Sequence, residues 1–496
     1  MKILLAASEM TPFAKTGGLA DVAGALPKAL AALGHEVAVV LPFYGTIDRR
    51  AAAAEIVLPE VIADLPIGKR ALTVWRASLA GPAGAAPVTV YLIEDRGLFN
   101  RPQLYALGGR EYPDNPLRFA YFCQAAIWML KGLGWTPDII HANDWQTALI
   151  PTYLAHLPAM QADPDLRRIR VLFSIHNMSY QGLYPGYVMR QIGLPATLFA
   201  MHGLEYRGYL NLLKGGILYS HELTTVSPQY AKEIQTRAYG CGLEGILRLR
   251  AAHLTGIMNG IDTREWDPAT DPALSAHYSR ADKSNKALCK RQVQQRFGLA
   301  TDPGRPLLAM IGRLIQQKGV DLLVEILPTL LEGAERAQFV LLGTGQPEFE
   351  AFFAKLARRY PEQVGLELGF NDALAHQIEA GADLFLMPSQ FEPCGLNQLY
   401  SLRYGAVPVV RRTGGLADSI TDATPSTIVW GKGTGFVFGP FDGAALLGAI
   451  RRALAMYLND KELWQKLIDN GMAQDFSWAR SAKEYEKLML RMVAGV

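Results

Sequence analysis

The sequence predicts an α/β protein with two Rossmann-like domains that face a central cleft. Three observations support this prediction. Short β-rich runs alternate with helical patterns along the chain, the series restarts after a turn-rich segment near the middle, and the chain has 496 residues. Because one hydrophobic core stops growing at about 250–300 residues, a chain of this length is expected to form two domains.

The composition is that of an ordinary globular protein. Hydrophobic residues make up 50% of the chain and charged residues 19%, which is typical of a protein with a large core. The 49 Lys and Arg are nearly balanced by 46 Asp and Glu, which gives a net charge of +3. A surface built to bind nucleic acid is therefore not expected, and any anion site must be a local cluster of cations.

The cysteines and the hydropathy pattern favour a cytoplasmic protein. The four cysteines lie far apart and form no C-x-x-C pair, which indicates neither a zinc site nor a disulfide framework. The apolar run after Lys2 ends at Ser8, and we interpret it as a first strand rather than a signal peptide. Since no run of about 18 apolar residues occurs, no membrane span is expected.

The first half of the chain has the pattern of a doubly wound parallel sheet. Each apolar run is followed by a polar or glycine-containing loop and a helical stretch, which is the order of a βαβ unit. The predicted strands are residues 2–7, 36–41, 88–93, 138–141, 171–175 and 223–226. A helix is predicted over about residues 19–33, and we assign residues 1–255 to this N-terminal domain.

A second series of strands follows the turn-rich segment at residues 258–262. Its predicted strands are residues 307–311, 339–342, 364–368, 384–387 and 407–410. We assign residues 256–475 to this C-terminal domain, and residues 476–496 to a helix that could pack back on the N-terminal domain. Ligands of such sheets bind beyond the carboxyl ends of the strands, so the active site is expected in the cleft.

The hexapeptide Thr-Gly-Gly-Leu-Ala-Asp occurs twice, at residues 16–21 and 413–418. Each copy is predicted at a strand-to-helix corner. Paired glycines let the backbone approach a ligand, a helix N-terminus offers N–H groups, and Lys15 adds a positive charge. A single glycine pair is often an ordinary turn, but the repetition favours a site for a phosphate or a sugar hydroxyl.

Two cations and a glutamate follow strands of the second half. Arg313 and Lys318 come after the strand at residues 307–311, where they could clamp a diphosphate and stabilise its charge as it leaves. Glu392 follows the strand at 384–387 and could accept hydrogen bonds from sugar hydroxyls. The alternatives are an exposed basic loop and an acid that favours a helix N-terminus.

Polar residues also follow two strands of the first half. Asp144 and His176 are predicted to contact a sugar, because each comes directly after an apolar run. A single histidine in this position is more often structural, but two adjacent strand ends favour a functional pair. Asp163 and Asp165 could bind a divalent metal, but the segment 161–168 resembles a polar surface loop, and Arg313 and Lys318 would supply the charge instead.

The sequence therefore predicts a reaction without a metal or other cofactor. The G-x-G-x-x-G, G-x-x-x-x-G-K-[ST] and G-x-S-x-G motifs do not occur where they would indicate a nicotinamide dehydrogenase, a P-loop NTPase or an α/β-hydrolase.

Taken in order, the motifs resemble those of bacterial glycogen synthases of the ADP-glucose type and plant starch synthases. They are KTGGLADV at 15–22, HANDW at 141–145, SIHN at 174–177, MNGID at 258–262, GRLIQQKG at 312–319, FEPCGLNQLY at 391–400 and RTGGLADS at 412–419. The resemblance implies the GT-B glycosyltransferase architecture. It also implies retaining transfer of glucose from ADP-glucose to the non-reducing end of glycogen or another α-1,4-glucan. The acceptor would lie on the first domain and the nucleotide-sugar on the second.

The resemblance also implies roles for individual residues. The catalytic residues would be Asp144, His176, Arg313, Lys318 and Glu392. The residues that bind the nucleotide-sugar would be Lys15, Thr16, Gly17, Gly18, Asp21, Asn259, Phe370, Cys394, Gly395, Leu396, Thr413, Gly414 and Gly415. Phe370 stands where the family frequently has a tyrosine that stacks on the base. Tyr400 stands where wider relatives have a second glutamate, and residues 101–112 resemble the family least.

Two other functions remain open. The chain could be a related glucosyltransferase or phosphorylase of the same fold, or a glucan-binding protein without activity. A diphosphate clamp disfavours a binding protein, which has no need of it. The base of the donor stays open between ADP-glucose and UDP-glucose, because a stacked aromatic ring accepts any base.

Overall fold

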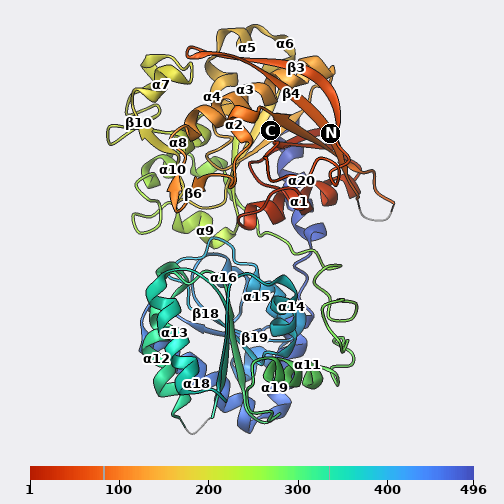
Figure 1. Ribbon diagram of the computed structural model, residues 1–496, viewed down its shortest axis with the longest axis vertical. Helices are drawn as coiled ribbons and strands as arrows, with labels where there is room; N and C mark the ends of the chain where they lie inside the picture. Colours follow the sequence, from red (N-terminus) through yellow and green to blue (C-terminus); the bar gives the residue numbers. More distant parts are fainter. Residues whose placement is uncertain (82–83, 334–335, 496) are drawn as a thin grey trace. The chain divides into compact units, whose positions relative to one another are not determined.

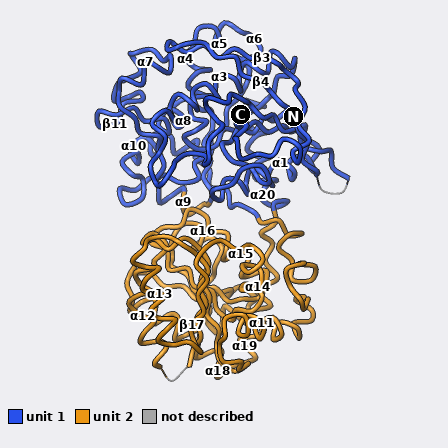
Figure 2. The backbone as a smooth tube through the Cα atoms, viewed as in Figure 1, with its two compact units in different colours: residues 1–226, 231–260, 478–496 blue, residues 227–230, 261–477 orange. Residues whose placement is uncertain are grey.

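The computed structural model describes residues 1–81, 84–333 and 336–495, and it divides into two compact units (Figure 2). Unit 1 comprises Met1–Val226, Ala231–Gly260 and Trp478–Val496, of which Val496 lies outside the described residues. Unit 2 comprises Ser227–Tyr230 and Ile261–Ser477. The main passage between the units thus follows Gly260, slightly later than the boundary expected after residue 255.

Unit 1 is built on a nine-stranded sheet. In spatial order its strands are β14 (Leu254–Gly256), β13 (Glu222–Thr225), β9 (Arg170–Ile175), β8 (Ile139–Asn143), β1 (Lys2–Ala6), β2 (Glu36–Pro42), β5 (Val88–Glu94), β4 (Gly68–Leu79) and β3 (Glu55–Leu65). The six strands expected in this half are all present, and their neighbours pair in parallel. Their apolar runs are continuous because both faces of the sheet are covered.

The expectation of a wholly parallel sheet was wrong at one edge. β4 pairs antiparallel with both β3 and β5. Only Pro66 and Ile67 join β3 to β4, and a connection this short reverses the chain, because parallel strands need a long crossover. Val61, Ala63 and Leu65 are buried while the residues between them are exposed, so the period-two pattern of a half-covered strand was present in the sequence.

Helices and small strands complete unit 1 (Figure 1). The helices are α1 (Gly18–Ala32), α2 (Arg96–Phe99), α3 (Asn115–Leu133), α4 (Leu149–His156), α5 (Pro158–Ala162), α6 (Pro164–Arg167), α7 (Val188–Gln191), η1 (Ala196–Leu198), α8 (Leu212–Tyr219), α10 (Glu244–Leu249) and η2 (Ala251–His253), and α9 (Pro228–Glu233) spans both units. The small strands are β6 (Ala106–Leu107), β7 (Arg110–Glu111), β10 (Leu183–Pro185), β11 (Glu205–Tyr206) and β12 (Tyr209–Asn211).

The surface loop expected at residues 161–168 is instead the junction of α5 and α6. The Asp163 carboxylate accepts hydrogen bonds from the N–H groups of Asp165 and Leu166, and Pro164 occupies the first turn of α6. A capping aspartate followed by a proline is a helix-start signal, which explains why these polar residues form a helix.

Unit 2 contains a six-stranded sheet that is parallel throughout, as expected for this half. Its order is β17 (Val364–Leu368), β16 (Gln338–Gly343), β15 (Leu307–Ile311), β18 (Leu384–Met387), β19 (Val407–Arg411) and β20 (Phe436–Phe438). The helices are α11 (Lys286–Arg296), η3 (Gln316–Lys318), α12 (Val320–Leu331), α13 (Pro347–Arg359), α14 (Asp372–Gly381), α15 (Asn397–Tyr404), α16 (Gly414–Ser419), α17 (Pro425–Val429), α18 (Gly443–Asn459) and α19 (Lys461–Met472). They cover both faces of the sheet (Figure 1).

Alternate residues of the central strand β15 pack into the two hydrophobic layers of unit 2, one on each face of the sheet. Leu308 and Met310 belong to one buried cluster, whereas Leu307 and Ala309 belong to the other. This sandwich explains why the strands of unit 2 read as short continuous apolar runs. None of the helices in the described part of the chain is long and apolar enough to cross a bilayer.

The last helix, α20 (Trp478–Ala494), follows unit 2 in sequence but belongs to unit 1, where it lies beside α1 (Figure 1). The ring of Tyr485 lies 5.4 Å from that of His141, which is in the middle of β8. Glu486 contacts the His35 ring at 3.0 Å, and the Ser481 hydroxyl donates to the Met258 carbonyl at 2.7 Å.

We expect truncation of a buried side chain of α20 to destabilise unit 1. Met489 is completely buried, whereas Leu490, the next residue, is 50% exposed. Met489→Ala should lower the free energy of unfolding by about 2–5 kcal/mol because it leaves a cavity. Leu490→Ala should change it by less than about 0.5 kcal/mol. Urea unfolding followed by circular dichroism measures both, and equal effects of the two variants would contradict the packing of α20.

Candidate functional site

In both units the expected site residues follow the carboxyl ends of parallel strands. In unit 1, Asp144 follows β8 and His176 follows the adjacent strand β9. In unit 2, Arg313 follows β15, and Glu392 and Thr413 follow β18 and β19. Because β15, β18 and β19 are neighbours in the sheet, the three loops leave the same edge.

Asp144 and His176 are joined directly. The backbone N–H of His176 donates to Asp144 Oδ1 at 2.8 Å, and the N–H of Asp144 donates to the Ser174 carbonyl at 2.9 Å. Asp144 has a φ of 58°, a left-handed conformation that is uncommon for a residue other than glycine. The two strand ends thus hold the aspartate in a fixed and costly backbone geometry, which is common at functional sites.

Asn143 determines the tautomer of His176. The Asn143 amide NH₂ donates to the carbonyls of Ala6 and His141, at 3.1 and 3.0 Å. Its Oδ1 therefore faces the His176 ring, where it lies 2.9 Å from Nε2. Since an amide oxygen can only accept, His176 Nε2 carries the proton. Asn143 lies within the quoted HANDW motif but was not among the expected site residues.

Burial shifts the pKa values of this pair in opposite directions, and both shifts favour the neutral form of the side chain. It raises the pKa of Asp144 to about 7 and lowers the pKa of His176 to about 4. At neutral pH the histidine is therefore neutral, and the aspartate titrates near neutrality. A sugar in contact with these residues would meet a neutral imidazole rather than a cation.

The first TGG corner is organised by a residue that the sequence analysis missed, Glu9. Its buried carboxylate accepts from the N–H and the hydroxyl of Thr16, both at 2.6 Å, and from the N–H of Gly17 at 3.0 Å. The N–H of Gly17, just before α1, is thus used by Glu9, whereas the expected N–H groups are those of the helix that begins at Gly18. Lys15 forms an ion pair of 2.6 Å with Asp21.

In unit 2, Lys318 and Glu392 form an ion pair. Lys318 Nζ lies 2.6 Å from Glu392 Oε2, which also accepts from the Ser389 hydroxyl at 3.0 Å. Glu392 is buried, so the residue predicted to bind the sugar is held directly against one of the cations predicted to bind the diphosphate. Oε1 is the oxygen of Glu392 that could accept from a sugar hydroxyl. Arg313 is exposed beyond the end of β15.

The second TGG copy differs from the first in its surroundings. A Cβ atom on Gly414 would lie 1.9 Å from the Glu392 carbonyl oxygen, and one on Gly415 would lie 2.0 Å from that of Cys394. Gly17 and Gly18 are exposed, and a Cβ on either would meet no described atom within 4 Å. The second pair is therefore required for packing against the Glu392–Cys394 turn, whereas the first pair leaves open space.

The remaining expected residues of the second TGG loop and the following turn lie around the same strand ends. Thr413 and Cys394 are buried, and Gly395 has a φ of 70° at the turn that precedes α15. The Gln398 amide donates to the carbonyls of Cys394 and Gly395, both at 3.0 Å, while Leu396 is half-buried. These contacts make the turn rigid, and the buried Cys394 serves in packing.

Two residues predicted to bind the nucleotide-sugar differ in exposure. Phe370, which follows β17, is 84% exposed, so one face of its ring is open to a base. Asn259 of unit 1 is buried, and its Oδ1 has no hydrogen-bond partner in the described part of the chain. A buried amide oxygen without a partner is costly and is therefore a plausible ligand contact.

The structure accounts for the two aspartates that were considered as metal ligands. Asp163 and Asp165 both pair with Lys131, at 3.0 and 3.1 Å. Among the described residues, one group has potential ligand atoms within 4.8 Å of one another, namely Glu265, Asp372 and His376. Asp271 contacts His376 Nδ1 at 2.7 Å, and none of the three is an expected site residue.

We expect Asp144 to make stability fall as pH rises from about 4 to 7. Its folded pKa of about 7 lies above the ordinary value of 3.8, so the folded state holds the proton over this range and the unfolded state does not. Asn keeps the left-handed conformation and lacks this titration. The stability difference between wild type and Asp144→Asn should therefore shift against wild type as pH rises. Urea unfolding at several pH values tests this, and a pH-independent difference would contradict it.

Comparison with known proteins identifies relatives over the whole chain. Residues 2–249 match the starch synthase catalytic domain family, and residues 292–474 match the glycosyl transferases group 1 family. The chain is 48% identical to a glycogen synthase of Anaeromyxobacter sp. (strain Fw109-5), with 100% of both chains covered. It is 45% identical to glycogen synthase 1 of Methylococcus capsulatus, with 100% of this chain and 97% of the relative covered.

Solved structures show the same relationship. The catalytic domain of starch synthase IV from Arabidopsis thaliana, bound to ADP and acarbose, matches with a TM-score of 0.89 and 36% identity over 99% of both chains. Sucrose-phosphate synthase from Thermosynechococcus elongatus shares the fold, with a TM-score of 0.60 and 17% identity over 100% of both chains. The chain thus has the GT-B fold, and it belongs to the glycogen and starch synthase family of glycosyltransferases, whose reaction adds glucose to an α-1,4-glucan.

Proposed function

We propose that this chain transfers glucose from ADP-glucose to the non-reducing end of glycogen or another α-1,4-glucan, with retention of configuration and release of ADP. The observation that carries the proposal is the set of groups at the strand ends of unit 2, where Arg313 and the Lys318–Glu392 pair provide cations beside a sugar-binding carboxylate. The ADP and acarbose bound to the Arabidopsis relative support both substrate classes.

The nucleotide is assigned to unit 2 and the acceptor glucan to unit 1. Phe370 would stack on the base through its exposed ring face. Arg313 and Lys318 would bind the diphosphate, and the Thr413–Gly415 loop would close on its phosphate side. In unit 1 the residues proposed to bind the nucleotide-sugar are Lys15, the N-terminus of α1 and Asn259, whose Oδ1 has no hydrogen-bond partner among the described residues.

The reaction requires stabilisation of the negative charge that develops on the departing diphosphate. As the bond between the anomeric carbon and the diphosphate oxygen breaks, negative charge builds on that oxygen, and Arg313 and Lys318 stabilise it. The acceptor hydroxyl then bonds to the anomeric carbon on the same face and passes its proton to the departing diphosphate. Glu392 keeps the ammonium of Lys318 in place, at 2.6 Å.

Asp144 and His176 would face the transferred sugar. Because His176 is neutral and protonated on Nε2, its ring can hold hydroxyls without competing with the cations for the diphosphate. The reaction is proposed to need no metal, since side chains supply the positive charge. A cytoplasmic location is proposed as well, consistent with four cysteines that form no disulfide in the described part of the chain.

The direct test is incorporation of labelled glucose into glycogen from ADP-glucose and from UDP-glucose, each with EDTA present. We expect incorporation with preference for ADP-glucose. A preference for UDP-glucose would change the donor but keep the reaction. No incorporation from either donor by folded protein would favour a glucan-binding protein, and release of glucose phosphate from glycogen and phosphate would favour a phosphorylase.

Removal of either cation of unit 2 should slow the reaction. Arg313→Ala and Lys318→Ala are each expected to lower kcat by about 10²–10³, because the charge on the leaving diphosphate loses its partner. Arg358→Ala is the matched control, since Arg358 is an exposed arginine in the last turn of α13. The measurement is initial-rate kinetics with ADP-glucose, alongside thermal unfolding. Near-wild-type kcat in both variants would refute the role of the clamp.

A further inference from the structure

Glu9 has an unusually complete set of hydrogen bonds for a carboxylate beside a predicted phosphate site. Oε2 accepts from the N–H groups of Thr16 and Gly17, at 2.6 and 3.0 Å. Oε1 accepts from the Thr16 hydroxyl at 2.6 Å and from the Tyr105 hydroxyl at 2.8 Å. The residue is only 5% exposed, so these four donors take the place of water.

Tyr105 links Glu9 to a segment of unit 1 that lies far from it in the sequence. Its hydroxyl also lies 2.6 Å from Ser8 Oγ, and burial together with the charge of Glu9 raises its pKa well above the usual range. The phenol therefore stays protonated and remains a donor to the carboxylate. Tyr105 lies in the stretch 101–112, which resembled the family least.

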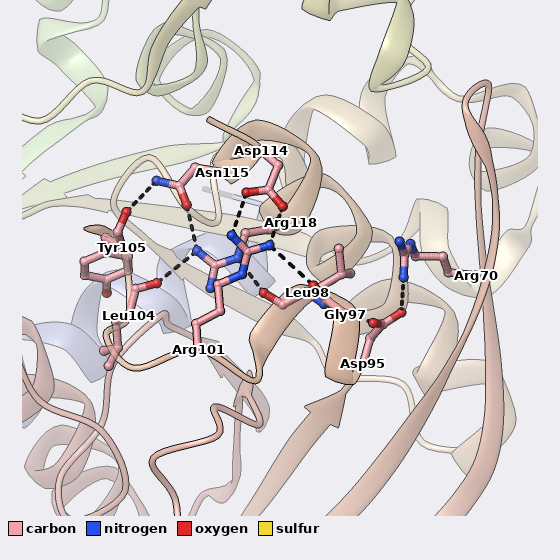
Figure 3. A network of polar contacts seen from close by, with 10 residues as sticks. All are labelled: Arg70, Asp95, Gly97, Leu98, Arg101, Leu104, Tyr105, Asp114, Asn115 and Arg118. Atoms are coloured by element: carbon pink, nitrogen blue, oxygen red, sulfur yellow. Dashed lines mark hydrogen bonds and ion pairs between the residues drawn. The ribbon is translucent and has the colours of Figure 1, made fainter. Parts of the chain in front are cut away.

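The backbone around Tyr105 is held by the start of α3 (Figure 3). The Asn115 amide donates to the Tyr105 carbonyl at 3.0 Å, and Arg118 Nη1 donates to Asn115 Oδ1 at 2.7 Å. Arg118 is completely buried and also donates to the carbonyls of Leu98 and Leu104, at 2.7 and 3.0 Å. Arg118 is thus connected to the TGG corner through Asn115, Tyr105 and Glu9. Tyr105 is bound at its carbonyl on one side and through its hydroxyl on the other.

We propose that Glu9 is a positioning residue for binding of the nucleotide-sugar. Its carboxylate holds the Lys15–Gly18 corner in place, and the Tyr105 hydroxyl holds the carboxylate. The inference rests on the proposed function, because that function assigns the corner to the nucleotide-sugar. Glu9 does not touch the donor in this account. It acts through Thr16 and Gly17, whose N–H groups it binds, and so sets the direction of Lys15 and of the α1 N-terminus.

Charge placement explains why a carboxylate is compatible with an anion site. A solvent-exposed acid here could turn toward the diphosphate and repel it, but the four donors to Glu9 hold its carboxylate in place and stabilise its charge. Gly17, the N-cap residue of α1, makes no side-chain cap, and the Ala20 N–H donates to the Gly17 carbonyl at 3.3 Å. The N–H groups of Gly18 and Leu19 are therefore the ones assigned to an anion. Glu9 uses the donors just before the helix and leaves those of the helix itself for the ligand.

Kinetics of matched variants test the proposal. Glu9→Gln can keep one oxygen for the two N–H groups, but its NH₂ group then meets the hydroxyls of Thr16 and Tyr105, which must turn from donors into acceptors. The variant should raise the KM for ADP-glucose at least about tenfold, since small misplacements cost this much. The KM for glycogen should stay unchanged. Tyr105→Phe should raise the donor KM roughly threefold to tenfold. Thr16→Val should also raise it, whereas Thr16→Ser, which keeps the hydroxyl, should restore it.

Two controls report on lost hydrogen bonds elsewhere in unit 1. Tyr121→Phe removes a tyrosine hydroxyl that donates to the Gly68 carbonyl at 2.8 Å. Glu94→Gln alters a carboxylate that accepts from Trp75 Nε1 at 2.8 Å. Both should leave the donor KM at the wild-type value. Calorimetric titration of ADP into wild type and Glu9→Gln gives a second readout that does not depend on turnover.

The outcomes separate this inference from the proposed function. A wild-type donor KM and ADP affinity in Glu9→Gln would overturn the inference while the function stands. Equal losses in both substrates with a lowered unfolding temperature would also overturn it, because they indicate a role in folding alone. Wild-type protein that neither transfers glucose nor binds ADP would overturn the function and the inference together.

Discussion

A carboxylate that is removed from water must be surrounded by donors or cations, and this constraint shapes the candidate site in each unit. Glu9 in unit 1 and Glu392 in unit 2 are each 5% exposed. Glu9 is surrounded by neutral donors from its own corner and from Tyr105. Glu392 is paired with the Lys318 ammonium and the Ser389 hydroxyl. Each TGG copy contacts one of these residues, through the Glu9 carboxylate in unit 1 and through the Glu392 carbonyl in unit 2.

The two TGG copies show one sequence used in two physical ways. In unit 1 the Glu9 side chain holds the corner, and its glycines face open space. In unit 2 the main-chain carbonyl of Glu392 accepts from the Gly415 N–H at 3.1 Å, and the glycines allow a close backbone approach. Glycine is required in the second copy because any Cβ would collide with a carbonyl.

The electrostatic pattern differs between the units in a way that suits transfer of a sugar from a diphosphate. Unit 2 supplies the cations Arg313 and Lys318 at the strand ends. Unit 1 supplies a neutral imidazole, because burial lowers the pKa of His176 to about 4, and an aspartate whose pKa is raised to about 7. Unit 1 also carries one expected cation, Lys15, which pairs with Asp21. The cations assigned to the leaving group are Arg313 and Lys318, where positive charge favours bond cleavage.

The sequence by itself determined the two α/β halves, eleven of their strands and the strand-end position of the expected residues, because these features depend on local periodicity and on the order of motifs. The β3–β4 hairpin was not predicted, although buried and exposed residues alternate along the second half of β3. Only the tertiary structure showed that Glu9 holds residues 16 and 17, that Lys318 pairs with Glu392, and that Asn143 fixes the tautomer of His176. The Lys318–Glu392 and Asn143–His176 contacts join segments far apart in the chain, and the Glu9 contacts depend on how the intervening loop folds back. Periodicity carries no information about either kind of pairing. The pKa shifts likewise follow from burial, which exists only once the chain is folded.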